Sequence, residues 1–218
     1  MKHYARFGLP ALLAALIILA ASCGGGSTQS MNQGKGNNSG NGMTRVDHGS
    51  MDMDNKASKM LMKNSKYSDE RFIDSMVPHH QGAVEMAEVG LKNADHREIK
   101  DLSRNIISSQ KAEIEDMKSI KKAEFGSSSV PMKMSPKQMD MMGMMMDPSK
   151  LANEHPFDKA FIDNMIPHHQ SAIEMAQVAQ NKSQNPRIKE LADNIVSAQE
   201  KEISQMKDWR KEWYPESN

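Results

Sequence analysis

The chain contains one pattern of residues twice, at a constant offset of 89 positions. Residues 72–87 read FIDSMVPHHQGAVEMA, and residues 161–176 read FIDNMIPHHQSAIEMA. The offset holds without a gap into the residues that follow each copy. Asn105, Ile106, Gln110, Glu113, Ile114, Met117 and Lys118 recur as Asn194, Ile195, Gln199, Glu202, Ile203, Met206 and Lys207. Two equal segments of this length are expected to form two similar units that pack on each other.

Each repeat has the periodicity of two amphipathic helices joined by a short polar loop. The pattern predicts helices over residues 68–93 and 97–124 in the first repeat, and over 157–182 and 187–213 in the second. Neither strand-like alternation nor a glycine-rich phosphate loop is present. Because each helix pair needs the other to cover its apolar stripe, the sequence predicts an all-α fold, a four-helix bundle of two helical hairpins.

Three further segments complete the predicted organisation. Residues 1–23 have basic residues, then an apolar run, then small residues before Cys23, which is the layout of a secretory signal peptide. The segment before Cys23 resembles a bacterial lipobox, so we expect a lipid anchor there; the alternative is a plain signal peptide with an incidental cysteine. Residues 24–66, rich in Gly, Ser, Asn and Lys, predict a disordered tether.

The predicted bundle covers residues 67–214. It divides into repeat one at 67–124, a methionine-rich linker at 125–156 and repeat two at 157–214. Export with a lipid anchor would place this bundle in the cell envelope, facing the periplasm or the cell surface.

The composition excludes several classes of protein. Cys23 is the only cysteine, which rules out an intramolecular disulfide and a cysteine-ligated zinc or iron–sulfur site. The 28 basic residues balance the 28 acidic ones without a basic stripe, so nucleic acid is not an expected partner. No catalytic constellation of Cys–His or serine-elbow type is present, and we do not expect an enzyme.

The paired histidines fall on the apolar faces of their helices. At 100° per residue, His79 and His80 lie on the same face as Met76 and Met86. The second repeat places His168 and His169 with Met165 and Met175 in the same way. A proline precedes each pair; Pro78 either kinks the helix beside the histidines or starts the main helix at its first turn.

Each second helix carries a carboxylate within its apolar stripe. Glu113 lies between apolar positions of the first repeat, and Glu202 repeats the anomaly. Gln110 and Gln199 stand three residues earlier, at the edge of the same face. Because buried charges need partners, we expect each carboxylate to accept a hydrogen bond from an inward imidazole, which leaves the other ring nitrogen free for a metal.

Methionine is unusually frequent, with 21 residues against 5 phenylalanines. Imidazole and thioether are the ligand types suited to Cu(I), so copper is the leading candidate and silver should bind similarly. The linker adds what we expect to be exposed thioethers that capture metal loosely. The predicted metal ligands are His79, His80, His168, His169, Met76, Met86, Met165, Met175, Met141, Met142, Met144, Met145 and Met146.

A less specific interpretation remains open for each feature. The histidine pairs could serve packing alone, hydrogen-bonded to Glu113 and Glu202, because buried polar networks also occur in cores without ligands. The helix methionines could be ordinary core residues. The linker methionines could form an apolar patch that docks on a partner or on the bundle.

The motif PHHQxAxEMA in each half, followed by QxxEIxxM, resembles domain-of-unknown-function family 305 over residues 67–210. The resemblance implies an exported bacterial protein with a ferritin-like four-helix architecture. It makes His79, His80, His168 and His169 the signature residues, and some methionine-rich members are associated with periplasmic copper binding and resistance. Glu-x-x-His, the motif of di-iron carboxylate bundles, does not occur in this chain, so ferroxidase chemistry is not expected.

Two main hypotheses follow from the sequence; a third and weaker one is a redox enzyme that uses bound copper, for which the sequence offers no substrate pocket. The favoured one is a cell-envelope protein that sequesters, buffers or delivers copper, chiefly as Cu(I), with a copper-delivery protein as a candidate partner. The alternative is a structural or protein-interaction lipoprotein without metal, in which buried His–Glu networks specify the bundle.

Overall fold

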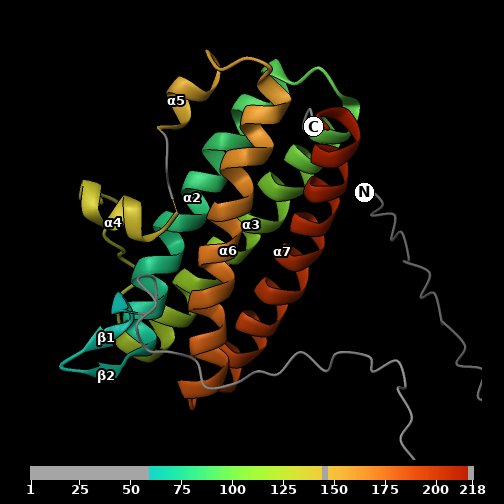
Figure 1. Ribbon diagram of the computed structural model, residues 1–218. Helices are drawn as coiled ribbons and strands as arrows, with labels where there is room; N and C mark the ends of the chain where they lie inside the picture. Colours follow the sequence, from blue (N-terminus) through green and yellow to red (C-terminus); the bar gives the residue numbers. More distant parts are fainter. Residues whose placement is uncertain (1–58, 144–146, 216–218) are drawn as a thin grey trace, which may run out of the picture. The chain divides into compact units, whose positions relative to one another are not determined.

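The computed structural model describes residues 59–143 and 147–215. Its four long helices are α2 (Asp69–Asn93), α3 (Arg97–Phe125), α6 (Phe157–Lys182) and α7 (Pro186–Trp213). α2 packs along α3, and α6 packs along α7, so each repeat forms one antiparallel hairpin (Figure 1). The predicted all-α bundle is confirmed, and each long helix begins and ends within one residue of its sequence-based boundary.

Side chains at the helix ends explain why those boundaries could be predicted. The Ser68 hydroxyl accepts a hydrogen bond from the Arg71 amide at the start of α2. The Asn185 side chain accepts from the Arg187 amide, at 2.9 Å, at the start of α7. Gly126 ends α3 with φ of +77°, a left-handed conformation that glycine adopts without strain.

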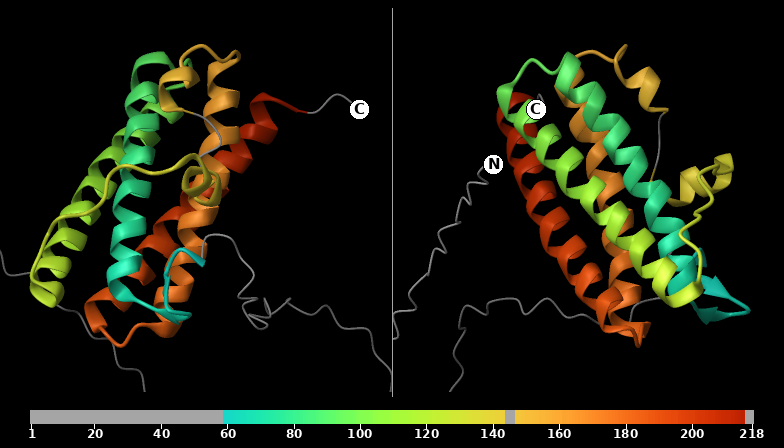
Figure 2. Two further views of the ribbon diagram at one scale, coloured as in Figure 1. Left: turned by 90° about the vertical axis from the view of Figure 1, so that its left-hand side faces the viewer. Right: turned by 180° about the vertical axis from the view of Figure 1, so that it is seen from behind.

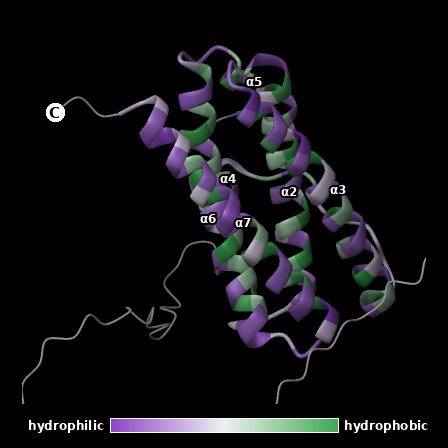
Figure 3. Ribbon diagram, turned by 90° about the vertical axis from the view of Figure 1, so that its right-hand side faces the viewer, coloured by the Kyte–Doolittle hydropathy of each residue, from purple (hydrophilic) through white to green (hydrophobic). Residues whose placement is uncertain are grey.

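The two hairpins meet mainly along α2 and α6, while α3 and α7 make a smaller contact. Both views of Figure 2 show the long helices packed side by side in one bundle. Figure 3 shows apolar and polar stretches alternating along each helix, as expected for amphipathic helices. Pro78 and Pro167 both lie inside their helices, so neither starts a helix at its first turn.

The apolar core is divided in two by a layer of polar residues. One cluster joins the beginning of α2 to the end of α6, and the other joins the end of α2 to the beginning of α6. The residues between the clusters are His79, His80, Gln110, His168, His169 and Gln199, all buried, and together they are called the histidine layer below. Because the helix pairs are antiparallel, both repeats contribute equivalent residues to it.

An ion pair within each hairpin recurs at the same offset of 89 residues. Asp74 pairs with the buried Lys121 in the first repeat, and Asp163 pairs with Arg210 in the second. Lys121 also donates to the carbonyl oxygen of Ser129 at 2.7 Å, which ties the start of the linker to the bundle.

The fold begins earlier than the sequence predicted. Residues Met62–Lys63 (β1) and Lys66–Tyr67 (β2) form a small antiparallel ribbon, with Asn64 and Ser65 in left-handed conformation at its turn. Leu61 is fully buried in the apolar core. Leu61 anchors this segment, so ordered structure is present in the last residues of the stretch assigned to the tether. The rest of the tether, the signal segment and Cys23 lie outside the described residues.

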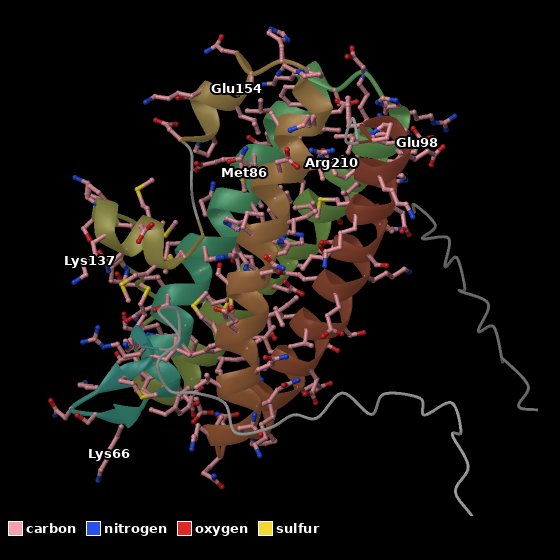
Figure 4. The ribbon with its side chains drawn as sticks, in the orientation of Figure 1. Lys66, Met86, Glu98, Lys137, Glu154 and Arg210 are labelled. Atoms are coloured by element: carbon pink, nitrogen blue, oxygen red, sulfur yellow. The ribbon has the colours of Figure 1, made fainter. Side chains whose placement is uncertain are left out.

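The linker contains two short helices, α4 (Pro136–Met141) and α5 (Pro148–Leu151). Its methionines were expected to be exposed, and this is only partly correct. Met132 is 49% exposed, whereas Met142 is 1% exposed. Sulfur atoms gather around α4 in Figure 4, where Lys137 extends away from the bundle. The linker is thus docked at Met142, while Met144, Met145 and Met146 lie outside the described residues.

Within residues 59–143 and 147–215, none of the helices is both long enough and apolar enough to cross a membrane.

Gly90 gives a test of the packing between the hairpins. A Cβ atom there would lie 2.5 Å from Ser103 Oγ and 2.9 Å from Phe161 Cε2. The second repeat has Ala179 and Ala192 at the positions of Gly90 and Ser103. Overpacking costs about 1–3 kcal/mol, against a helix-propensity gain of about 1 kcal/mol. We expect Gly90→Ala to lower the urea midpoint of unfolding.

The double variant Gly90→Ala/Ser103→Ala imports the residue pair of the second repeat. It should recover part of the lost stability, because one of the two close contacts is removed. A Gly90→Ala protein more stable than wild type would contradict this account of the packing around Gly90.

Candidate functional site

The four histidines of the repeated motif meet at the middle of the bundle. His79 and His80 come from α2, and His168 and His169 come from α6. The rings of His79 and His168 lie 3.8 Å apart between centroids, at an interplanar angle of 40°. Within each pair the ring centroids are 6.2 Å apart. All four side chains are excluded from solvent.

One histidine of each repeat is held by a carboxylate from the neighbouring helix. The Nε2 atom of His80 lies 2.7 Å from Glu113 Oε2, and that of His169 lies 2.7 Å from Glu202 Oε2. An ionised carboxylate only accepts hydrogen bonds, so the hydrogen bond to it places a proton on Nε2 of each ring. The Nδ1 atom of each ring then presents a lone pair. The expected pairing of inward imidazole and carboxylate is present, and it involves the second histidine of each pair.

The two remaining histidines differ from each other. His79 Nε2 lies 2.8 Å from the hydroxyl oxygen of Ser171, a residue of α6. Among the described residues, neither ring nitrogen of His168 has a side-chain hydrogen-bond partner, and the nearby backbone of His79 only opposes the lowering of its pKa. Three rings of the layer thus have one side-chain partner each in this part of the chain, whereas His168 has none.

Within the described part of the chain, the histidine layer has an unusual set of buried polar atoms without hydrogen bonds. These atoms are Nδ1 of His79, His80 and His169, both ring nitrogens of His168, and Oε1 of Gln110 and Gln199. Leaving a buried polar group unsatisfied costs about 1–3 kcal/mol, and native proteins contain few such groups. If this layer served packing alone, its unsatisfied atoms would lower the stability of the folded protein. The free lone pairs on these atoms are those that a cation would use.

Burial keeps the two central histidines neutral. The pKa of His79 and of His168 is lowered well below the usual value, first by loss of hydration and then by the charges of neighbouring histidines. A neutral imidazole has the lone pair that metal ligation requires. The central pair is therefore in its ligating form at neutral pH.

Thioethers flank the histidine layer on both sides. Met76 and Met175 belong to one apolar cluster, and Met86 and Met165 belong to the other. Each cluster takes one of these residues from each repeat, and all four are buried. Met117 and Met206 add a further sulfur atom to either side.

In the parts of the chain that the structure describes, no three side chains among His, Cys, Asp and Glu are already arranged to hold a metal ion. Coordination in this layer would therefore need a thioether, an amide oxygen or a turned imidazole ring in addition to the histidines as they lie.

The carboxylates are reached from solvent through a cleft between α3 and α7. The cleft has a volume of about 500 Å³, and both Glu113 and Glu202 line it, together with Asn105 and Asn194. The two glutamate side chains are 19% and 14% exposed, whereas their histidine partners are fully buried. The carboxylates thus lie between solvent and the histidine layer.

The linker approaches the histidine layer at Met142. The Met142 carbonyl oxygen accepts a hydrogen bond from Ser171 Oγ at 2.6 Å, and Ser171 is also the partner of His79. Met141 is partly buried, whereas Met144, Met145 and Met146 lie outside the described residues. The structure therefore brings one predicted linker residue beside the predicted histidines.

Sequence reasoning missed Ser171. The signal was present, because the two copies of the motif differ at this position, with Gly82 in the first and Ser171 in the second. Its importance depends on contacts between α2, α6 and the linker, which one repeat alone does not reveal.

Fold and site define a class of protein: a bundle of two repeated helical hairpins with a histidine–methionine core. The model for the family "Domain of unknown function (DUF305)" matches residues 69–210 and also 24–121. The chain belongs to this family, as the repeated motif indicated. A stretch of 49 residues is also 45% identical to "Uncharacterized protein L153" of Acanthamoeba polyphaga mimivirus, covering 22% of this chain and 32% of that protein.

Solved structures of related proteins share the fold. CopM in its Cu(II)-bound form is 43% identical, with a TM-score of 0.63, over 68% of this chain and 99% of that chain. CopM in its Cu(I)-bound form is 39% identical over the same shares, with a TM-score of 0.60. A DUF305 fragment from Deinococcus radiodurans is 26% identical, with a TM-score of 0.58, over 64% of this chain and 93% of that chain.

The lowered pKa of His79 and His168 predicts how stability depends on pH without metal. Below about pH 6.5 the unfolded chain takes up protons that the folded protein excludes from these rings. The free energy of unfolding should thus be highest above pH 6.5. It should fall by about 1.4 kcal/mol per pH unit for each histidine as the pH is lowered. Urea titrations at pH 7.5, 6.5 and 5.5 measure the slope.

The matched control is His79→Gln/His168→Gln, which removes both titrating rings and keeps the sites polar. Its stability should decline less between pH 6.5 and 5.5 than that of wild type. Equal slopes for the two proteins would contradict the assignment of neutral, buried rings.

Proposed function

We propose that this protein binds copper, chiefly as Cu(I), and that silver binds in the same place. The single observation that carries the proposal is the histidine layer with its unpartnered ring nitrogens, flanked on both sides by buried thioethers. The primary ligands are drawn from His79, His80, His168 and His169, completed by Met76, Met86, Met165 or Met175. Soft thioethers and imidazoles favour Cu(I) over hard cations such as Mg²⁺ or Ca²⁺.

The carboxylates have a supporting role in this proposal. Glu113 and Glu202 hold His80 and His169 by Nε2, which directs Nδ1 of each ring to the metal. Gln110 and Gln199 lie in the same layer with free amide oxygens. The cleft between α3 and α7 gives a cation a route to these carboxylates from solvent.

The comparisons support the choice of metal. Structures of CopM exist in Cu(I)-, Cu(II)- and silver-bound forms, and the present chain is 39–43% identical to them. If this chain has the same ligand chemistry, it would bind the same ions. The similarity to CopM also favours a binding protein over an enzyme.

The protein's place in the cell follows from its sequence. A signal segment ending at Cys23 would export the chain and anchor it by a lipid in the cell envelope. The linker methionines, Met141, Met142 and Met144–Met146, would collect metal loosely and pass it to the histidine layer. Such a protein sequesters or buffers copper, or delivers it to a copper-handling partner, and so contributes to metal resistance.

The decisive experiment is an anaerobic Cu(I) titration of the purified protein against a chromophoric chelator. We expect the wild type to compete with the chelator, and His79→Gln/His168→Gln to lose at least tenfold in affinity, or about 1.4 kcal/mol. His155→Gln, at an exposed position before α6, is the matched control and should bind as wild type does. Circular dichroism verifies that each variant folds.

Failure of the wild type to compete would sink the proposal and favour the structural or interaction lipoprotein. Under that alternative the thermal midpoint does not respond to metal, whereas a ligand that binds only the folded state must raise it. If the double histidine variant still binds Cu(I), the metal site is in the linker and the histidines serve packing alone.

A second prediction separates the core thioethers from those of the linker. Leucine has nearly the volume of methionine but no sulfur atom, so the exchange removes a ligand while keeping the packing. We expect Met76→Leu/Met175→Leu or Met86→Leu/Met165→Leu to weaken Cu(I) binding by the same titration. Met132→Leu, at an exposed linker position, serves as the control. Unchanged affinity in both core variants would exclude these thioethers as ligands.

A further inference from the structure

The two repeats differ at the residue that faces the central histidine pair. His79 and His168 occupy the same position in each repeat, and their rings lie 3.8 Å apart. His79 is bonded to Ser171 from the opposite hairpin. The repeat relates this pair to His168 and Gly82, and Gly82 has no side chain to offer. This difference explains why His168 has no side-chain partner among the described residues.

The proton of Ser171 decides the state of His79. Ser171 Oγ lies 2.6 Å from the Met142 carbonyl oxygen and 2.8 Å from the His168 carbonyl oxygen. A hydroxyl has one proton, and a carbonyl oxygen can only accept a hydrogen bond. When Ser171 donates to either carbonyl oxygen, it accepts a hydrogen bond from His79. The imidazole proton is then on Nε2, and the lone pair of His79 is on Nδ1.

The same serine holds the linker against the bundle. Met142 is 1% exposed, and its carbonyl oxygen is fixed by Ser171. The next residue, Gly143, has φ of +67°, and a Cβ atom there would lie 2.7 Å from the carbonyl oxygen of Pro167. Only glycine allows the linker backbone to approach α6 so closely. The contact is thus a built docking point beside the histidine pair.

We propose that Ser171 is a positioning residue that latches the linker to the histidine layer and makes its two central rings unequal. It fixes His79 with Nδ1 available, brings the Met142 segment beside the ring pair, and leaves His168 free to turn towards a metal. This inference rests on the proposed function for its ligand, a soft monovalent cation, but the latch itself is a property of the metal-free protein.

The geometry also allows Ser171 to orient the His79 ring without holding the linker. When the linker leaves, the Ser171 hydroxyl can donate to the His168 carbonyl oxygen instead, at 2.8 Å. His79 then keeps its partner and its Nε2 proton. The linker can consequently open for exchange of metal while the ring that remains in the bundle stays oriented.

The test uses Ser171→Ala with Ser103→Ala as the matched control. Ser103 is another fully buried serine, and its hydroxyl has no hydrogen-bond partner, so its removal breaks no bond. The first readout is the tautomer of His79 in the metal-free protein, from long-range ¹H–¹⁵N spectra of the imidazole rings. We expect the Nε2–H form in wild type and Ser103→Ala, and a mixture of tautomers in Ser171→Ala.

The second readout is trypsin cleavage of the linker after the exposed Lys133 and Lys137. Loss of one hydrogen bond of ordinary strength should accelerate cleavage by about fivefold in Ser171→Ala. Ser103→Ala should be cut at the wild-type rate. Gly82→Ser is the reciprocal variant, and the added hydroxyl should give His168 a single tautomer.

A His79 tautomer and a cleavage rate that are both unchanged in Ser171→Ala would overturn the latch. Silver titration of the same proteins then tests its link to binding, and we expect Ser171→Ala to bind Ag(I) about fivefold more weakly than Ser103→Ala. Failure of wild type to bind Ag(I) or Cu(I) would refute the proposed function, whereas the tautomer and cleavage readouts judge the latch without any metal.

Discussion

The hydrogen bonds from His80 to Glu113 and from His169 to Glu202 set the register of the two helices within each hairpin. A carboxylate within an apolar stripe is tolerated only if it finds a donor, and each donor lies at one height on the neighbouring helix. A shift of one helix past its hairpin partner by one turn would separate the carboxylate of that hairpin from its imidazole donor. The histidine layer therefore fixes how α2 meets α3 and α6 meets α7, and the two apolar clusters fill the space on either side of it.

Much of this arrangement could be predicted from local pattern. The helix boundaries follow from periodicity and from capping residues such as Ser68 and Asn185, which act within a few positions. The inward direction of the histidines and their pairing with Glu113 and Glu202 follow from helical geometry and the burial of charge. These inferences succeeded because each depends on one helix or on two helices that are adjacent in sequence.

The remaining features depend on contacts between distant segments. Nothing in the polar composition around Leu61 indicates that its side chain joins the core. Likewise, Met142 reads as one of several linker methionines, and only the Ser171 hydroxyl and the close approach of Gly143 to Pro167 distinguish it. The repeat itself concealed the asymmetry, because Gly82 and Ser171 differ by a small side chain whose partners lie on the other hairpin and in the linker. The metal ligands stay a prediction for the same reason.

The energetics of the histidine layer favour a ligand-binding role over packing alone. A layer that only specified the bundle would gain from partners for every buried nitrogen and oxygen. Yet, among the described residues, His168 has no side-chain partner and both glutamines keep an amide oxygen without a hydrogen bond. Each such atom lowers the stability of the empty protein. A cation bound by those lone pairs would satisfy these atoms, so the free energy lost in the empty protein would contribute to binding affinity. A neutral imidazole also needs no proton removed before it binds a metal. In the described part of the chain no three His, Cys, Asp or Glu side chains already converge, so a site in this layer would need further ligands. The flanking thioethers would supply them for a soft metal.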